Sequence, residues 1–313
     1  MLRYLASRVL SVAPTLFVVS VVVFALQHML PGDAATALAG DVLDPKIIAQ
    51  IREEYHLDQP VVVQYGLWLG GVLHGDLGQS LRNHIGVAEL IAQKLPATAL
   101  LSAMAMAWAL LIGVPAGIVA ALRKGGWLDY AANVAGLAGL SVPPFWLGLM
   151  LILFVSAKLG LLPASGYVSP LQDPKAALLS LLMPSFVLGL SVAAVMMRHT
   201  RSAMLSTMAA DYIRTARAKG LYERLVVLRH GLRNALVPLI TMAALQTGQL
   251  LAGAVLTEQV FTIPGFGRLI VDAVYTRDYA VVQGVVLVTA CIYVTLNLAA
   301  DVAYGVVDPR IRR

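Results

Sequence analysis

Few side chains in this 313-residue sequence have the types and spacing that catalysis or metal binding requires. The six histidines are scattered, at His28, His56, His74, His84, His199 and His230. The single cysteine, Cys291, cannot form an intramolecular disulfide, and no Cys/His spacing is typical of a zinc site. A phosphate-binding P-loop needs Gly-Lys followed by Ser or Thr, and none of the six lysines follows a glycine. We therefore expect a non-enzymatic chain with no catalytic residue, metal site or cofactor of its own.

The most distinctive charge lies in Arg198–Arg233, where eight Lys or Arg stand against Asp211 and Glu223. This segment has 36 residues, whereas a connection between adjacent helices usually has about 2–8. A basic segment beside a membrane is attracted to anionic lipid, by about 1 kcal/mol for each basic residue. The alternative is a shaped segment that inserts into the groove of a partner protein.

Local signals in this segment predict a short helix over Asp211–Gly220. Its acidic first residue suits the positive N-terminal end of the helix dipole, and Arg217 and Lys219 suit the C-terminal end. Gly220 suits the left-handed conformation that ends many helices.

A second helix is predicted over residues 222–232, with Leu225, Leu228 and Leu232 on one face. Attraction to lipid does not require two short helices separated by a glycine. The succession therefore favours insertion into a partner's groove.

The elements around this segment are predicted to be membrane spans. Hydrophobic residues make up 59% of the chain and charged residues only 13%, against about 25% charged in soluble domains. Six stretches lack Asp, Glu, Lys and Arg and are long enough to cross a bilayer. They are Val9–Gly32, Leu95–Leu122, Tyr130–Ala157, Ala176–Met197, Asn234–Thr257 and Tyr279–Ala300. We expect the prolines inside them to mark kinks, and Gly113 and Gly117 to be points of close packing.

The distribution of basic residues predicts the orientation of these spans. With the N-terminus inside the cell, 15 Lys and Arg lie in inside segments and 8 in the longer outside segments. Both termini are therefore expected on the cytoplasmic side. The first apolar run exceeds the 7–15 residues of the apolar region in a signal peptide, so we expect a retained helix.

The first outer segment is predicted to contain short helices. Asp44 and Pro45 favour an N-cap and a first helical position, which opens a helix to about Tyr55. An apolar helical stripe follows, ended by Gly75. It comprises Tyr65, Trp68, Leu69, Val72 and Leu73. Because Tyr and Trp favour the membrane interface, this helix is expected to lie flat against the bilayer or the other helices.

Two further groups of residues are functional candidates. Glu258, Pro264, Gly265 and Gly267 lie in a turn-rich outer segment that suggests a re-entrant loop, a candidate periplasmic gate. Polar residues inside spans are candidates by default, and here they mark a candidate translocation path or bonds between helices. They are Gln246, Gln249 and Asn297.

Two runs in the basic segment, residues 212–221 and 228–238, resemble the EAA loop of bacterial ABC-importer permeases, closest to the dipeptide, oligopeptide and nickel branch. Further matches to this branch lie in the same order along the chain, before and after the basic segment. They are at residues 30–33, 57–60, 75–78, 260–269 and 308–312. By analogy Arg214, Thr215 and Ala216 occupy the Glu-Ala-Ala positions, and Gly220 the glycine. The proline that usually follows soon after comes later in this chain, at Pro238.

The resemblance implies an all-α polytopic protein of the bacterial inner membrane, a type I ABC importer permease with six transmembrane helices and cytoplasmic termini. Residues 1–32 would form the N-terminus and first helix, 33–94 a periplasmic segment, and 95–313 a five-helix core with a coupling loop at 198–233. The loop would dock on ATPase subunits. The residues expected to act there are Asp211, Arg214, Thr215, Ala216, Arg217, Lys219, Gly220 and Leu221.

The implied partners are a second homologous permease, two ATP-binding subunits that carry ATP and Mg²⁺, a periplasmic substrate-binding protein and membrane lipid, with no nucleic acid. The implied cargo is a di- or oligopeptide. A nickel or metal-chelate importer of the same family is the alternative. An ion-coupled secondary transporter would be expected to carry charges at mid-span, and the six stretches have none.

Overall fold

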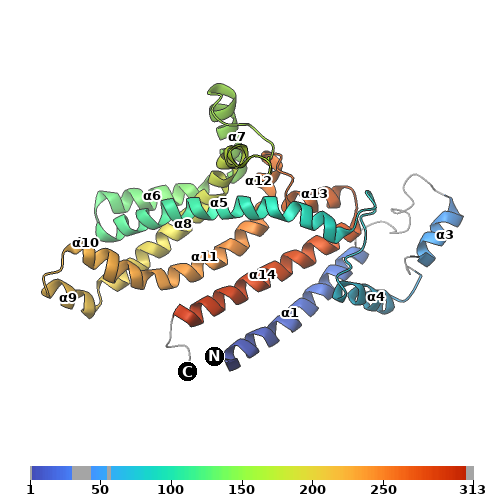
Figure 1. Cartoon of the computed structure of the whole chain (residues 1–313), viewed down its shortest axis with the longest axis horizontal. Coiled ribbons are helices and arrows are strands. Elements are labelled where there is room, and N and C mark those ends of the chain that lie inside the picture. The colour runs from blue at the N-terminus through green and yellow to red at the C-terminus, as the bar shows by residue number, and fades with distance from the viewer. Residues whose placement is uncertain (1, 30–43, 55–57, 308–313) are drawn as a thin grey trace. The chain divides into compact units, whose positions relative to one another are not determined.

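The computed structural model of the chain describes residues 2–29, 44–54 and 58–307, and these are almost entirely helical, as predicted (Figure 1). The elements in chain order are α1 (Leu2–Met29), α3 (Pro45–Glu54), α4 (Val61–Leu73), α5 (Val87–Leu122), α6 (Trp127–Ser141), α7 (Pro144–Leu151), the π-helix η1 (Ile152–Lys158), α8 (Pro174–Met208), α9 (Asp211–Ala218), α10 (Glu223–Leu225), the π-helix η2 (Val226–Leu232), α11 (Arg233–Gly253), α12 (Val255–Val260), α13 (Phe266–Tyr275) and α14 (Tyr279–Val307).

These elements form two compact units. Unit 1 comprises Met1–Leu5, Ala97–Pro264 and Thr295–Arg313, and unit 2 comprises Ala6–Pro96 and Gly265–Val294. The predicted divisions after residues 32 and 94 separate membrane spans from segments outside the membrane. The two compact units do not test such divisions, so they stay predictions. The matching motifs at residues 30–33 and 308–312 lie outside the described residues.

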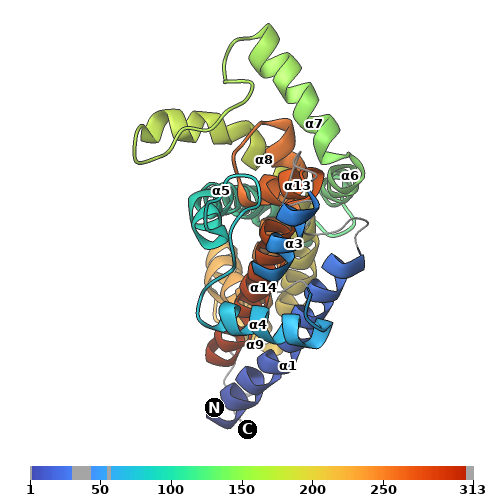
Figure 2. The ribbon, with the colours of Figure 1, turned by 90° about the vertical axis from the view of Figure 1, so that its right-hand side faces the viewer.

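Three described helices are long and apolar enough to cross a membrane, namely α5, α8 and the part of α14 over Tyr279–Ala299. A fourth crossing is possible for α6 together with Pro144–Lys158, which meet at 94°. The kink expected from Pro143 and Pro144 within Tyr130–Ala157 is therefore a bend of 94°, and a single crossing by this stretch stays a prediction. The helix breaks at Val142, which is extended (φ −76°, ψ 121°), because Pro143 disfavours helical geometry in the residue before it. Figure 2 shows α7 leaving α6 at this break.

The expected first and fifth spans overlap α1 and α11. The total of six spans and the side on which each terminus lies stay predictions.

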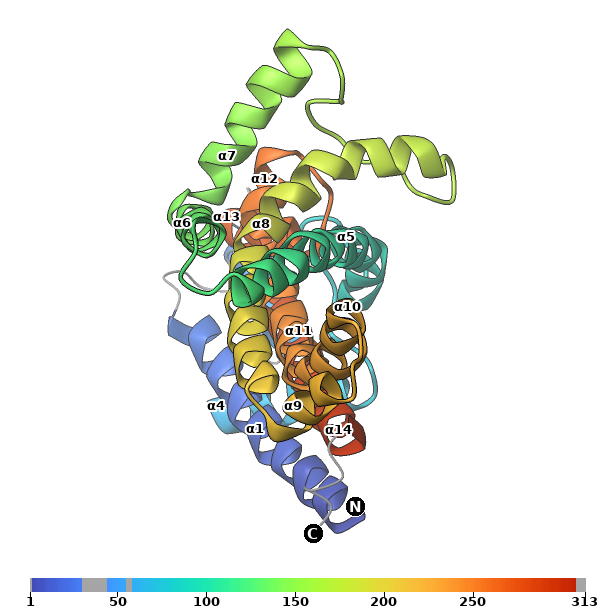
Figure 3. The same ribbon diagram turned by 90° about the vertical axis from the view of Figure 1, so that its left-hand side faces the viewer.

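Helix α8 runs through the centre of unit 1. Its N-terminus is capped by Asp173, whose carboxylate accepts hydrogen bonds from the backbone N–H groups of Lys175 and Ala176 at 2.9 and 3.0 Å. The helix packs against α6, α7, α11, α12 and η2, and in Figure 3 it lies between α6 and α11. The largest apolar core of the unit forms around it, with side chains from α5, α11 and α12.

Helices α5 and α8 approach each other so closely that only small residues fit between them. A Cβ atom on Gly113 would lie 2.5 Å from the carbonyl oxygen of Ala193, and one on Gly117 would lie 2.5 Å from the Cβ of Thr200. The approach is reciprocal, because a Cβ on Gly189 of α8 would lie 2.5 Å from the carbonyl oxygen of Ala105. The predicted close packing at Gly113 and Gly117 is confirmed.

In unit 2, α4 packs against α1 through aromatic side chains (Figure 1). The ring of Phe24 lies 5.4 Å from that of Tyr65 and 5.7 Å from that of Trp68, centroid to centroid. The hydroxyl groups of Ser20 and Tyr65 share a hydrogen bond of 2.8 Å. Tyr65 and Trp68 of the stripe predicted on α4 thus face another helix, whereas Leu73 at its end is exposed.

The predicted helix start at Asp44 is also confirmed, since its carboxylate accepts a hydrogen bond of 2.9 Å from the N–H of Lys46. A second polar tie in this unit fixes the start of α14. The buried carboxylate of Asp278 accepts hydrogen bonds from the Ser80 hydroxyl at 2.5 Å and from the N–H of Leu81 at 3.2 Å.

We expect Gly117→Val to destabilise the protein, because the new side chain must displace the backbone of α8. Overpacking of this kind costs about 1–3 kcal/mol, measured as a lower midpoint of thermal unfolding in detergent. The matched control is Gly139→Ala in α6, where a Cβ would meet its nearest atom at an ordinary 3.7 Å. Equal effects of the two substitutions would contradict the close packing of α5 on α8.

Candidate functional site

The basic segment begins as a continuation of α8. The structure extends this helix to Met208, so the prediction that a loop begins at Arg198 is wrong. The charges from Arg198 onwards were used to place the end of the apolar span. Charged side chains do not by themselves end a helix. A short turn at Ala209 and Ala210 follows, and then α9 begins. Figure 1 shows α9 and α10 at the end of α8 and α11.

Helix α9 ends in the hydrogen-bonded cap that a glycine allows. The N–H of Gly220 donates to the carbonyl of Arg217 at 2.9 Å, and the N–H of Leu221 donates to that of Ala216 at 3.4 Å. These two bonds make a Schellman motif, and Leu221 packs against the apolar cluster that contains Ala216. Gly220 has φ +74°, a conformation that costs other residues about 1–2 kcal/mol. The predicted glycine-capped helix is confirmed.

The inner face of α9 rests on a small apolar cluster. Ile213 and Ala216 are buried against Val226 of η2, with Met208 and Leu221 beside them. Of the three residues in the Glu-Ala-Ala positions, therefore, only Ala216 faces inward and seats the helix.

The outer face of α9 is exposed and polar. Of the residues expected to act on a partner, the exposed ones on α9 and in the turn after it are Asp211, Arg214, Thr215, Arg217, Lys219 and Gly220. Arg214 is paired with Asp211 one turn away, and the hydroxyl of Thr215 donates to the carbonyl of Asp211 at 3.1 Å. These contacts are local, so the face remains available to a partner.

Polar contacts brace both ends of α9. The Arg217 guanidinium donates two hydrogen bonds to the Glu223 carboxylate, from Nε at 3.0 Å and from Nη2 at 2.7 Å. These bonds lower the pKa of Glu223, so the contribution of the pair to stability is present above the ordinary carboxylate pKa and is lost as the pH falls through the lowered value. At the other end, the side-chain amide of Asn234 donates to the Tyr212 hydroxyl at 3.0 Å. Arg217, expected to contact a partner, thus also braces the loop.

The second predicted helix exists as α10 and η2, but its predicted apolar face is wrong. Leu225 and Leu228 are exposed, and the buried residues are Val226, Val227 and Gly231. The prediction assumed the period of an α-helix, whereas η2 is a π-helix with bonds five residues apart. Val226 and Gly231, separated by five positions, consequently share the inner face.

The candidate gate segment folds into unit 1 as far as Pro264. Glu258 in α12 is fully buried and accepts a hydrogen bond from the hydroxyl of Thr98, which is also fully buried. Phe261 and Ile263 lie in the main core, and the carbonyl of Phe261 accepts a hydrogen bond of 2.9 Å from the N–H of Gly166. The part of the segment before Pro264 is therefore a packed turn, and its re-entrant or gating role stays a prediction.

The turn geometry of this segment differs from the expectation that glycines form it. Thr262 adopts the left-handed conformation, with φ +54°. Gly265 is extended (φ −92°, ψ 177°) and precedes α13, where Gly267 is buried. Pro264, the last residue of unit 1, is exposed. The predicted gate residues are thus divided between the two units.

The residues proposed for a translocation path have different surroundings. Gln246 is buried and Gln249 is exposed, although both lie on α11, and Asn297 of α14 is half-buried. They stay candidates.

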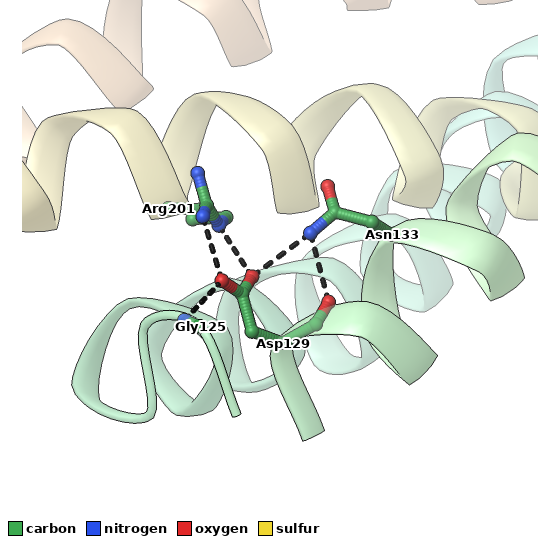
Figure 4. A network of polar contacts seen from close by, with 4 residues as sticks. All are labelled: Gly125, Asp129, Asn133 and Arg201. Carbon is green, nitrogen blue, oxygen red and sulfur yellow. Dashed lines mark hydrogen bonds and ion pairs between the residues drawn. The ribbon is translucent and has the colours of Figure 1, made fainter. Parts of the chain in front are cut away.

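One partly buried ion pair was not found from the sequence. The carboxylate of Asp129 in α6 accepts two hydrogen bonds from the Arg201 guanidinium of α8, at 2.6 and 2.7 Å. It also accepts one from the N–H of Gly125 at 3.0 Å and one from the side chain of Asn133 at 2.8 Å (Figure 4). An acidic residue beside an apolar helix was the available signal, but its partner lies 72 positions away.

We expect Thr98→Val to lower the free energy of unfolding by about 1.5–3 kcal/mol, because it removes a hydrogen bond to a buried carboxyl group. The matched control is Thr241→Val. The Thr241 hydroxyl is buried and has no hydrogen-bond partner among the described residues, so its loss should be neutral or stabilising. Thermal unfolding in detergent measures both, and an equal effect at the two positions would contradict a structural role for the bond.

Comparison with known proteins gives the family. The family described as "Binding-protein-dependent transport system inner membrane component" matches residues 113–313, and the N-terminal family of the same transport systems matches residues 1–102. The chain is 43% identical over 312 residues to the glutathione transport system permease protein GsiC of Escherichia coli O6:H1, covering 100% of this chain and 99% of that protein. The GsiC protein of Shigella dysenteriae serotype 1 is 42% identical over the same lengths.

A likeness to a solved structure agrees on the fold. A chain of the MetNI methionine ABC transporter, in an inward-facing conformation, matches with a TM-score of 0.57 at 20% identity, over 70% of this chain and 96% of that one. Permeases of this family are non-catalytic, multi-pass inner-membrane subunits that work with separate ATPase and substrate-binding subunits. The chain belongs to the family of binding-protein-dependent transport system inner membrane components, and it is the permease subunit of an ABC importer.

Proposed function

We propose that this permease imports peptide-like substrates and receives the energy for transport through α9. The observation that carries the coupling role is the construction of α9, whose inner face is buried while its outer face is exposed and polar. A helix built in this way presents one face to a partner and transfers force through the other. The partner would be an ATP-binding subunit, which holds the ATP and Mg²⁺.

The contacts of α9 indicate which helices would move with it. The helix follows α8 after a short turn. It is braced to α10 by Arg217 and to the start of α11 by Tyr212. Displacement of α9 would therefore displace the ends of α8 and α11 together, which are neighbours in the core of unit 1.

Membership of the family supports the proposed assembly. It would contain this chain, a second homologous permease, two ATP-binding subunits and a periplasmic substrate-binding protein. The residues proposed to meet the ATP-binding subunit are the exposed ones, with Arg214, Thr215 and Lys219 at the centre of the face.

The proposed cargo class rests on the relatives. The similar permeases are named for glutathione, a short peptide with free carboxylates. Di- and oligopeptides share its backbone and charged ends. A nickel or metal chelate, the alternative cargo in this branch, differs from them in being a metal complex.

Gly220→Val should uncouple transport from ATP hydrolysis. The Cβ position of Gly220 is open, so a side chain there is opposed only by the left-handed backbone, at about 1–2 kcal/mol. We expect the new residue to unwind the cap and misplace α9, so that glutathione uptake per ATP hydrolysed by reconstituted complexes falls several-fold. Gly220→Asn, which tolerates this conformation, is the control and should retain most of the coupling. A wild-type ratio in the Val variant would reject the coupling role.

The cargo class is tested with the substrate-binding protein encoded with this chain. Isothermal titration with reduced glutathione, a dipeptide, a longer peptide and a nickel–histidine chelate should give heat of binding with at least one of the peptides. The reconstituted complex should then take up that same peptide only with ATP. Binding of the nickel chelate alone would assign the permease to the metal branch.

A further inference from the structure

The acceptor sites of the Asp129 carboxylate are all occupied. Its two oxygens accept four bonds, two from Arg201, one from Gly125 and one from Asn133 (Figure 4). The side chain of Asp129 is only 7% exposed and that of Arg201 26%. A forked guanidinium–carboxylate pair of this kind fixes direction as well as distance.

The position of this pair on α8 is also specific. Arg201 lies about two turns before the end of α8, and α9 begins just beyond that end. At the same level the backbone of α8 touches α5, because a Cβ on Gly117 would lie 3.0 Å from the amide nitrogen of Arg201. The last turns of α8 are thus held by α5 through the backbone and by α6 through the ion pair.

An ion pair with a buried carboxylate adds little net stability compared with apolar packing, because desolvation of the charge offsets the attraction between the partners. The attested use of such an ion pair is to specify one arrangement of the elements that it joins. Apolar contacts between α6 and α8, such as Gly136 against Met197, could slide or rotate, whereas the fork between Asp129 and Arg201 would break.

We propose that Asp129 is a positioning residue of the energy-coupling step, which locks α6 to the end of α8 so that a displacement of α9 reaches α6. The inference rests on the proposed coupling role of α9. Because the chain continues from α6 into α7 at the 94° bend, the lock also gives the displacement a route to that part of unit 1.

The first test uses Asp129→Asn, which keeps the shape and removes the charge, and Arg201→Lys, which keeps the charge and removes the fork. We expect radiolabelled glutathione uptake per ATP hydrolysed to fall at least fivefold in the Asn variant and less in the Lys variant. The double variant should be no worse than Asp129→Asn, because both act on one contact. The matched control is Asp272→Asn, which removes a longer pair between an exposed carboxylate and Arg268, at 3.6 Å, and should keep the wild-type ratio.

A structural role alone would lower the amount of folded complex and leave the ratio of uptake to hydrolysis unchanged. That result in both variants would overturn the proposal. Failure of the underlying function looks different. If Gly220→Val and Asp129→Asn both keep the ratio, α9 does not couple the energy; if only Gly220→Val lowers it, the Asp129 inference alone fails.

The second test needs only nucleotide and no transported cargo. Spin labels at Val134→Cys of α6 and Tyr222→Cys beside α9, both at exposed positions, are placed in a Cys291→Ser background of the assembled complex. We expect one narrow distance distribution that stays the same in nucleotide-free and ATP-bound states. Asp129→Asn should broaden it or shift it on ATP binding, and an unchanged distribution in that variant would overturn the proposal.

Discussion

The close approach of α5 to α8 is the constraint on which the rest of unit 1 depends. The two backbones are brought into contact at Gly113, Gly117 and Gly189. In a membrane the hydrophobic effect does not drive helices together, so small residues that allow close van der Waals packing contribute to their association. With α8 held along its length, Arg201 meets Asp129 and the end of α8 is held close to where α9 begins. A permease needs this continuity if force applied at one end is to reach the other.

Buried polar side chains in unit 1 join separate elements. Thr98 and Glu258 tie α5 to α12, and Asp129 and Arg201 tie α6 to α8, while exposed charges gather on the basic segment. The family assigns ATP hydrolysis and substrate capture to other subunits. The buried polar groups of this chain accordingly connect helices to one another. The exposed helix α9 is the proposed point where energy enters.

Local signals allowed part of this to be predicted. The cap at Asp44 and the glycine-ended helix at Gly220 depend on neighbouring residues, so the sequence displays them. The break after Val142 was expected only as a kink, since a proline shows where a helix is weakened but not the angle that packing imposes. The face of η2 was missed because a π-helix changes the period, and the Asp129–Arg201 pair because its members are distant in sequence.

Cross-linking tests the central claim, that α9 meets the ATP-binding subunit with its outer face. A cysteine replaces Arg214 in a Cys291→Ser background, and a short bifunctional reagent is applied to the assembled complex in membranes. The control cysteine replaces Leu171, which is 96% exposed and lies on the predicted periplasmic side. The account predicts a cross-link to the ATP-binding subunit from position 214 and none from position 171. An assembled complex that gives no cross-link from position 214 would contradict it.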